Sequence, residues 1–361
     1  MKSKYHPWKR GFSEFKNCHR FNRLLRGSLA SKPLSTLPVQ LQNSYYVTTD
    51  KGMFFLEGGR VTKILEAHLY GIAFSETSYY LSAYFGKVST VVRGNLEDLR
   101  KARAGVSIEE IYTTDVASTN SRIHQIFFSN GTLYIADSGR NTILEYDETS
   151  GELTNETAPF FDLFGSPVHY DNNHINSVAA YHDYVVFCAY RAGSGSLIGV
   201  IKDGKVAGFH YKNAGVHDIF VSDQDFFFGD TFGKGLPDRG GALIHSGGLY
   251  SDVFSRSPGW VVRGIAGSLD GELLVGHSHK GERRKRFKGN GALLVFEKGE
   301  FKQELVMPDW AQTYQIMQAD GVFVRCTDGK GPLGYDALIQ KLRTLLGEPV
   351  CEHDVLIIPK K

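Results

Sequence analysis

The strongest constraint on the fold of this chain is a pattern of short strands that repeats along the sequence. Residues 122–147 (RIHQIFFSNGTLYIADSGRNTILEYD) contain three strand patterns in a row, separated by turn residues at 129–131 and 138–141. A three-stranded sheet of this size cannot bury both of its faces alone. The rest of the chain must therefore supply similar units that pack against it.

The same pattern recurs, and the copies align on one column of residues. The column contains Tyr70, His124, Asn176, His217, Arg263 and Tyr314, and each of these is followed two residues later by Ile or Val. Neighbouring members are 41 to 54 residues apart, about 49 on average. A period of about 40–50 residues with four strands per unit is typical of a β-propeller. A β-sandwich with accidental self-similarity is the alternative, and six aligned copies argue against it.

The two ends of the chain complement each other. Strand patterns at residues 45–48, 53–57 and 60–65 precede the first member of the column, so they lack an inner strand. The last member, Tyr314, begins an inner strand but is followed by a helical pattern at 337–346. Pairing the N-terminal strands with the last inner strand would close the ring and remove an open sheet edge. We therefore expect an all-β, six-bladed propeller over residues 41–361, with a short C-terminal helix.

Residues 1–40 form a basic N-terminal extension. Residues 1–33 contain nine Lys and Arg against one acid, Glu14, and apolar residues recur there at helical spacing. Three interpretations are open: a docked terminal helix, a contact to an acidic partner or anionic lipid, and an organelle-targeting segment.

The composition of the whole chain narrows the class of protein further. The net charge of +2 does not indicate nucleic-acid or membrane binding, and no apolar run has the length of a membrane span or signal-peptide core. The four cysteines lack metal-type spacing, and Cys188 and Cys326 lie in strand patterns, as expected of buried thiols. These features favour a reducing compartment and a cytoplasmic location, with organelle targeting by the basic N-terminus as the alternative.

The propeller prediction turns two columns into one candidate site. The start of each inner strand and the end of the next strand lie at the same end of a blade, because the two strands are antiparallel. The second column contains Asp137 and Asp230, in the blades of His124 and His217. A purely structural ring would repeat one residue type, whereas this one combines imidazoles, phenols, an amide and a guanidinium. Such a mixture is typical of a ligand site at the channel mouth.

The residue types suggest roles. His124, His217 and the nearby His174 could hold a divalent metal, and His124 or His217 could act as a general base. Asp137 and Asp230 would orient the histidines, and Arg263 would clamp an anion. Tyr70, Asn176 and Tyr314 would contact the ligand. The alternative is that these histidines only hydrogen-bond to strand ends and water.

A basic loop near the same channel mouth indicates the charge of the ligand. Residues 277–289 contain six Lys and Arg against one Glu, and the loop begins at His277. Lys234 and Arg191 come from the equivalent regions of the two preceding blades. Together they favour an anionic ligand, although a charged loop could also serve solubility alone. Nucleic acid is disfavoured because the basic run is short and has one interleaved aromatic residue.

Two stretches carry a resemblance to known proteins. Residues 130–147 (NGTLYIADSGRNTILEYD) resemble the repeat unit of the NHL/SMP-30-like group of six-bladed propellers. The motifs at 174–178 (HINSV) and 260–265 (WVVRGI) are similar to an uncharacterised group of bacterial propellers. The resemblance implies the fold over about residues 45–330. It does not imply an activity, because the NHL/SMP-30-like group includes lactonases, lyases, synthases and interaction modules.

The calcium site of the lactonase branch uses Glu, Asn and Asp. Asn176 matches its Asn, but the first column contains no Glu, so neither calcium nor lactonase activity is implied. The sequence thus predicts a propeller that binds a small anionic ligand, as a metal-assisted hydrolase or lyase. The alternative is a non-catalytic propeller that binds a protein or glycan with the same face.

Overall fold

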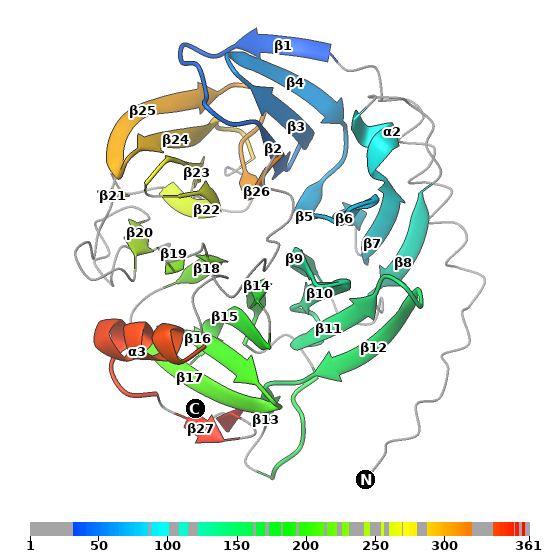
Figure 1. Cartoon of the computed structure of the whole chain (residues 1–361), viewed down its shortest axis with the longest axis vertical. Coiled ribbons are helices and arrows are strands. Elements are labelled where there is room, and N and C mark those ends of the chain that lie inside the picture. The colour runs from blue at the N-terminus through cyan, green and yellow to red at the C-terminus, as the bar shows by residue number, and fades with distance from the viewer. Residues whose placement is uncertain are drawn as a thin grey trace.

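Sheets arranged around a common axis make up the molecule, as Figure 1 shows for the computed structural model. The structure describes residues 32–85, 88–100, 108–114, 122–161, 164–169, 173–181, 183–192, 195–212, 215–221, 226–230, 242–245, 254–255, 260–268, 270–279, 287–319, 335–349, 351–353 and 356–357. Within these residues the fold is an all-β propeller with few helices, as the sequence predicts.

Each sheet is a run of antiparallel strands that begins near the axis and ends at the outside. The first three, from the axis outward, are β5 (Leu69–Phe74), β6 (Ser78–Phe85), β7 (Val88–Asn95) and β8 (Glu109–Thr113); β9 (Ile123–Ser129), β10 (Thr132–Asp137), β11 (Thr142–Asp147) and β12 (Glu152–Thr157); and β14 (Ile175–Tyr181), β15 (Tyr184–Ala192), β16 (Gly195–Lys202) and β17 (Lys205–Lys212), extended by β27 (Cys351–His353).

The remaining sheets continue around the axis. They are β18 (Val216–Val221), β19 (Phe226–Asp230), β20 (Ala242–His245) and β21 (Phe254–Ser255); β22 (Trp260–Gly267), β23 (Glu272–His279), β24 (Gly291–Glu297) and β25 (Glu300–Met307); and β26 (Thr313–Gln318), β2 (Tyr45–Thr49), β3 (Gly52–Glu57), β4 (Arg60–Leu65) and β1 (Lys32–Thr36). A two-stranded parallel pair, β13 (Phe160–Phe161) with β28 (Leu356–Ile357), lies outside these sheets.

The number of blades stays a prediction. In five of the sheets the four innermost strands are each at least five residues long, so these are fully formed blades. In the sheet β18–β21, the described parts of β20 and β21 have only four and two residues. The structure therefore has five regular blades, and the sixth that the repeats predict depends on this less regular sheet.

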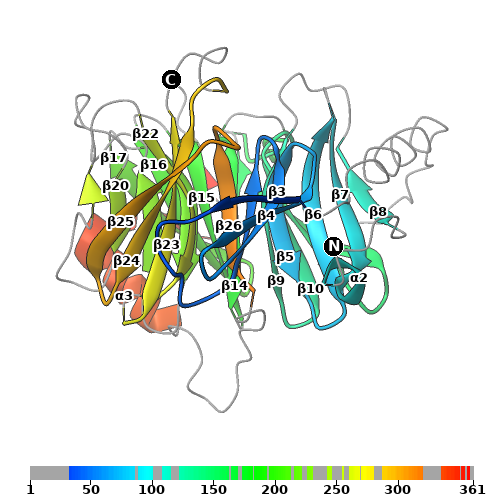
Figure 2. The ribbon, with the colours of Figure 1, turned by 90° about the horizontal axis from the view of Figure 1, so that it is seen from above.

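Strands from both ends of the chain form one sheet, as the sequence predicts. The inner strand β26 pairs with β2 in antiparallel register, with Val47 opposite Ile316. Figure 2 shows β26 beside the N-terminal strands β3 and β4. The outermost strand, β1, pairs with β4, so part of the stretch assigned to the N-terminal extension belongs to the sheet.

Buried carboxylates fasten this sheet to its neighbours. Glu272, at the start of β23, accepts hydrogen bonds from the backbone N–H of Gln42 (2.9 Å) and of Asn43 (3.1 Å), and from the Tyr45 hydroxyl (2.9 Å). Asp50 Oδ1 accepts from two backbone N–H groups of the segment that leads into β26, at 3.0 and 2.9 Å. Closure of the ring therefore rests on strand pairing together with charge-assisted hydrogen bonds.

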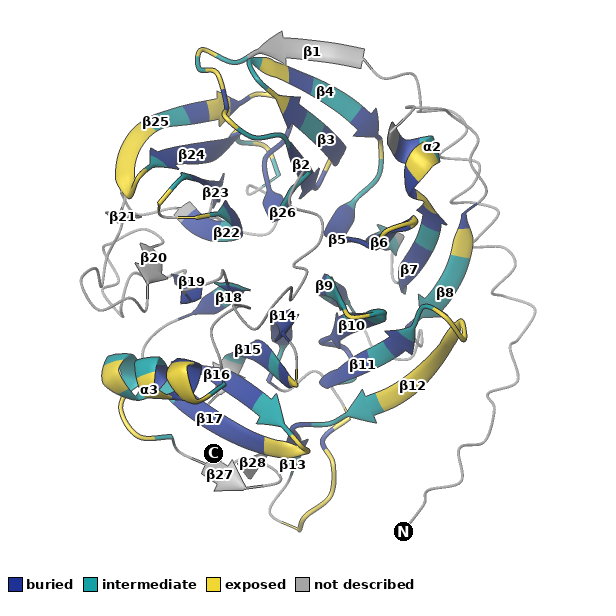
Figure 3. Ribbon diagram, viewed as in Figure 1, coloured by how far each residue is buried: buried dark blue, intermediate teal, exposed yellow. Residues whose placement is uncertain are grey.

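Apolar side chains fill the space between neighbouring sheets. Figure 3 shows the strands near the axis as buried, whereas β12 and the end of β25 carry exposed residues at the outside. Phe54 and Trp310, for example, are buried with ring centroids 4.4 Å apart. Cys188 is a buried free thiol, as the sequence predicts. Cys326 lies outside the described residues.

The predicted C-terminal helix is present as α3 (Tyr335–Leu346). It buries Leu338, Ile339 and Leu342 against the cluster formed by β14–β19. A short helix that the sequence analysis did not anticipate, α2 (Leu96–Arg100), follows β7. None of the helices in the described residues is long and apolar enough to cross a bilayer.

Candidate functional site

A β-bulge lies at the start of every inner strand, at the residues of the predicted column. On β5 the pairing with β6 passes from Leu69 to Gly71, which leaves Tyr70 as the extra residue. The same irregularity falls on the other members of the column: His124, Asn176, His217, Arg263 and Tyr314. Bulges re-aim side chains and are frequent next to functional sites. We call these six residues the axial ring.

Ring contacts show that members of the axial ring lie together. The ring centroids of Tyr70 and Tyr314 are 4.3 Å apart, and those of Tyr70 and His124 are 5.0 Å apart. The Arg263 guanidinium carbon lies 5.7 Å from the centroid of the Tyr314 ring. The predicted convergence of the column therefore holds for these four residues, from four different sheets.

Further residues extend the axial ring, and they stand two positions before its members. His68, Arg122 and His174 precede Tyr70, His124 and Asn176 by two residues, and side chains two apart on a strand share a side. Arg122 Nη1 donates to the Tyr70 hydroxyl (2.8 Å), and the His174 ring centroid lies 4.9 Å from that of His124. We call the axial ring with these three residues the axial site.

Aromatic rings line the two sides of the axial site. His68 stacks on Tyr314 at 5.4 Å, and its Nε2 lies 3.1 Å from the Tyr314 hydroxyl. Tyr190 contacts His217, with ring centroids 4.6 Å apart. The sequence analysis assigned no role to Arg122, His68 or Tyr190, although the two-residue spacing would have identified the first two.

Burial divides the axial site into a base and a rim. Tyr70, Tyr314 and Asn176 are 4%, 5% and 3% exposed. The rim residues are half-buried: His68, Arg122, His124, His174, His217 and Arg263. The rim therefore carries two permanent positive charges above an aromatic and amide base.

The environment keeps the two most perturbed imidazoles of the axial site neutral. Burial lowers the pKa of His124 well below its usual value, and the nearby His174, Arg263, Arg122 and His217 lower it further. Burial, with Arg122 and Lys51, lowers the pKa of His68 to about 4. Neutral imidazoles can accept a proton or a hydrogen bond at neutral pH.

Two buried nitrogens of the axial site have no hydrogen-bond partner among the described residues. They are Nε2 of His124 and Nδ2 of Asn176. Buried polar groups are nearly always paired, so each such atom requires an explanation. An amide Nδ2 can only donate, so the missing partner of Asn176 must be an acceptor.

The two predicted carboxylates have hydrogen bonds of their own at the strand ends. Asp137 is fully buried and accepts from the Tyr112 hydroxyl of the neighbouring sheet (2.7 Å) and from the backbone N–H of Arg140 (3.1 Å). Asp230 accepts from the backbone N–H of Gly215 (3.1 Å), which fixes the approach to β18. Asp137 therefore connects two sheets and shapes a turn.

Three further predicted ligand contacts are placed differently or lie outside the described parts of the chain. His277 is fully buried inside β23, opposite Val262. β23 continues past the bulge, so His277 belongs to the strand and not to the basic loop. Lys234, the side chain of Arg191 and loop residues 280–286 lie outside the described residues, as does the basic segment 1–31.

The predicted metal site gains no geometric support. No group of three or more His, Cys, Asp or Glu side chains in the described parts of the chain could hold a metal ion. His124, His174 and His217 all belong to those parts. Their role as metal ligands stays a prediction.

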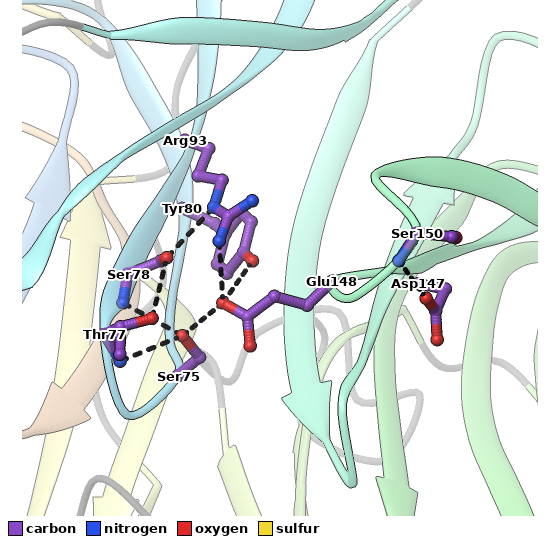
Figure 4. Close-up of polar contacts among 8 residues, drawn as sticks. All are labelled: Ser75, Thr77, Ser78, Tyr80, Arg93, Asp147, Glu148 and Ser150. Carbon is purple, nitrogen blue, oxygen red and sulfur yellow. Dashed lines mark hydrogen bonds and ion pairs between the residues drawn. The ribbon is translucent and has the colours of Figure 1, made fainter.

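A second polar cluster lies at the opposite end of the strands, as Figure 4 shows. Glu148 Oε1 accepts from the hydroxyls of Ser75 (2.5 Å) and Tyr80 (2.9 Å) and lies 3.5 Å from Arg93 Nη2. Arg93 Nε also donates to Ser78 (2.9 Å). Every group is paired, and Glu148 links the sheet β9–β12 to the sheet β5–β8. This cluster therefore resembles the Glu272 fastening and not a ligand site.

Comparisons with known proteins show the fold and nothing narrower. No protein-family model matches the sequence, and no curated protein matches it. The chain is similar to a solved structure of a nidogen/laminin complex, with a TM-score of 0.51, 10% identity, and 76% of this chain and 97% of that chain covered.

Two other solved structures are more distant. The PQQ-bound aldose sugar dehydrogenase of Streptomyces coelicolor has a TM-score of 0.44 and 16% identity, with 68% of this chain and 91% of that chain covered. A putative TolB from Agrobacterium tumefaciens has a TM-score of 0.47 and 9% identity, with 77% and 93% covered. These comparisons indicate a β-propeller, and the resemblance to the NHL/SMP-30-like group stays a prediction.

Proposed function

We propose that the axial site binds a small anionic ligand. The observation that carries this proposal is the unpaired Nδ2 of Asn176, which is buried beside an unpaired His124 Nε2. A ligand oxygen would supply the acceptor that the amide lacks. Arg122 and Arg263 add two positive charges on the rim, and guanidinium groups favour carboxylates and phosphates.

We further propose that catalysis at this site would be proton transfer next to the bound anion, as in a lyase. His124 is neutral because its pKa is lowered, so it can accept a proton. Arg263, close to Tyr314, would stabilise negative charge that develops on the ligand. Hydrolysis with a histidine oriented by Asp137 has less support, since that carboxylate is bonded to Tyr112 and Arg140.

A non-catalytic propeller that binds a protein or glycan through the same face is the second candidate. The half-buried aromatic rings of His68 and Tyr190 on the rim favour it, because aromatic rings are frequent at such interfaces. Substitution of His124 and His217 by alanine separates the two. A catalytic site would lose turnover with the fold intact, whereas a broad interaction surface would keep most of its affinity.

Calorimetric titration tests the binding proposal. The probes are inorganic phosphate and glucuronate, with glucose as the uncharged counterpart of glucuronate. We expect the anions to bind the wild type, and Asn176→Ala and Arg263→Ala to weaken binding by about tenfold or more. Glu300→Ala, an exposed change on β25, is the matched control and should bind as the wild type does. Equal binding of glucose and glucuronate, or full affinity in both site variants, would refute the proposal.

We also propose that the sheet β18–β21 is a sixth blade. Its inner strand β18 contacts β14 on one side and β22 on the other, as an inner strand in a closed ring should. A cytoplasmic location is likewise a proposal, favoured by the buried free thiol of Cys188.

A further inference from the structure

A layer of hydrogen bonds lies directly beneath the axial ring, and it is built from the next residue on each strand. Gln125, Ser177, Asp218, Gly264 and Gln315 each follow a member of the ring. All five are buried. The layer therefore consists of the immediate chain neighbours of His124, Asn176, His217, Arg263 and Tyr314.

Asp218 is the centre of this layer. Its Oδ1 accepts a short hydrogen bond from Gln125 Nε2 and lies 3.4 Å from Ser177 Oγ. Its Oδ2 accepts from the backbone N–H of Gly264 at 2.5 Å. One carboxylate thus joins strands of four sheets: β9, β14, β18 and β22.

The other members of the layer complete the connection. Ser177 Oγ donates to Gln125 Oε1 and accepts from the backbone N–H of Ile219 (3.2 Å). Gln125 Nε2 also lies 3.4 Å from the backbone oxygen of Tyr314. Gln315 bridges β5 and β9 by accepting from Ile72 N–H (2.9 Å) and donating to the Ile126 oxygen (3.1 Å). No member of the layer belongs to the proposed ligand contacts.

The bond to Gly264 bears most directly on the axial site. Residues 263 and 264 form the bulge of β22, and Gly264 has a left-handed φ of +78°. A Cβ at Gly264 would lie 2.8 Å from Ile316 Cγ1, so the segment fits closely against β26. The direction of the Arg263 side chain therefore depends on a backbone turn that Asp218 Oδ2 holds.

We propose that Asp218 is the positioning residue of the axial site, because its carboxylate fixes the backbone segments that carry Arg263, His124 and Asn176. This inference rests on the proposed function of the axial site as an anion site. Two donors converge on the two carboxylate oxygens, so the ionised form of Asp218 satisfies the layer. A protonated or amide side chain offers one acceptor fewer and leaves Gly264 N–H or Gln125 Nε2 facing a donor or an oxygen that is already protonated.

Burial supports a second, measurable property of the layer. It raises the pKa of Asp218 to about 7, although hydrogen bonds from Gln125, Gly264, Ile219 and Ser177 oppose the rise. The other titratable side chains on the strands around it are Cys188, Asp230, His124, Arg263 and Tyr314. The pKa of the Cys188 thiol is raised by burial and, to a smaller extent, by Asp218. Ordering of the layer should therefore change close to neutral pH.

Nuclear magnetic resonance of the full chain tests the inference without any ligand. The signals followed are the Gly264 amide, the Arg263 Nε–H group and the His124 ring, in the wild type and in Asp218→Asn. In the wild type we expect the Gly264 and Arg263 signals to titrate together with a midpoint near pH 7. In Asp218→Asn the titration should disappear, and the Arg263 and His124 signals should be displaced at every pH.

Glu272→Gln is the matched control. Glu272 is also buried and also accepts from three donors, but it lies at the start of β23, at the opposite end of the sheets. This variant should leave the three signals and their titration unchanged. Unchanged Arg263 and His124 signals in Asp218→Asn would overturn the inference. If Asp218→Asn does not fold, Gln125→Met removes one donor to Asp218, and the same displacement or its absence decides.

Titration with inorganic phosphate separates this inference from the proposed function. If phosphate binds, Asp218→Asn should weaken it about tenfold while Glu272→Gln does not, a size common for residues that orient ligand-binding groups. If no anion binds the wild type, the proposed function fails, yet the ligand-free signals still report whether Asp218 positions Arg263. Anion binding at full strength in Asp218→Asn would contradict the positioning role directly.

Discussion

Glu272 offers a sharp test of how the propeller is closed. Its carboxylate accepts from two backbone N–H groups at 2.9 and 3.1 Å and from the Tyr45 hydroxyl at 2.9 Å. Glu272 is 4% exposed and Tyr45 is fully buried. The Glu272→Ala substitution would leave the hydroxyl without a partner in the core and the two N–H groups only partly hydrated.

The size of the effect follows from these three donors. A buried donor left unpaired costs about 1–3 kcal/mol, and a partly hydrated one costs about 0.5–1.5 kcal/mol. Removing the desolvated charge offsets part of this sum. We therefore expect Glu272→Ala to lower the free energy of unfolding by about 3 kcal/mol. Tyr45→Phe removes only the hydroxyl, and in the double variant the two effects should not add, because they share one hydrogen bond.

Urea unfolding followed by circular dichroism measures these differences. Glu300→Ala is the control, because Glu300 is an exposed carboxylate paired only with Lys302, and it should have no measurable effect. A loss of stability in Glu272→Ala no larger than in Glu300→Ala would refute the view that this carboxylate fastens the composite sheet.

Three further predictions concern other parts of the structure. Gly276→Ala should destabilise the chain by at least about 2 kcal/mol in urea, because a Cβ there would lie 2.0 Å from the Arg263 backbone oxygen, whereas Gly271→Ala should be mild. The folded-state pKa of Asp218 is raised, so the stability it contributes is complete below pH 4 and is lost as the pH rises through 7. The stability of the wild type relative to Asp218→Asn should therefore fall by about 3 kcal/mol between pH 4.5 and 8, and a flat difference would contradict the raised pKa. Glu148→Gln should lower the unfolding free energy by about 1–2 kcal/mol through its bonds to Ser75 and Tyr80 and leave phosphate binding intact, and weaker binding would contradict the separation of the two polar clusters.

Much of the fold could be predicted from residue periodicity. The strand patterns at 45–48, 53–57 and 60–65 correspond to β2, β3 and β4, and their pairing with β26 follows from the need to close the ring. Short-range turns and alternation determine these elements. The outer part of the sheet β18–β21 has no such clear pattern, so the blade count could not be established in this way.

The sequence also predicted which residues form the axial ring, but not how their side chains are aimed. A bulge adds one residue to one strand, and it is visible only when both strands are paired. Arg122 and His68 were missed although they stand two residues before the column. Asp137 was assigned to His124 because both lie at one end of their strands. Its partner, Tyr112, comes from the neighbouring sheet, and periodicity within one repeat gives no information about it.

The position of an anion in the crystal would test the central claim most directly. Crystals of the wild type and of Asn176→Ala would be soaked in bromide, and the anomalous signal of bromide would be mapped. We predict a bromide ion within hydrogen-bonding distance of Asn176 Nδ2 and near Arg263 in the wild type, and its loss in Asn176→Ala. Bromide bound only at the outer surface, with none at the axial site, would contradict the assignment of this site to an anionic ligand.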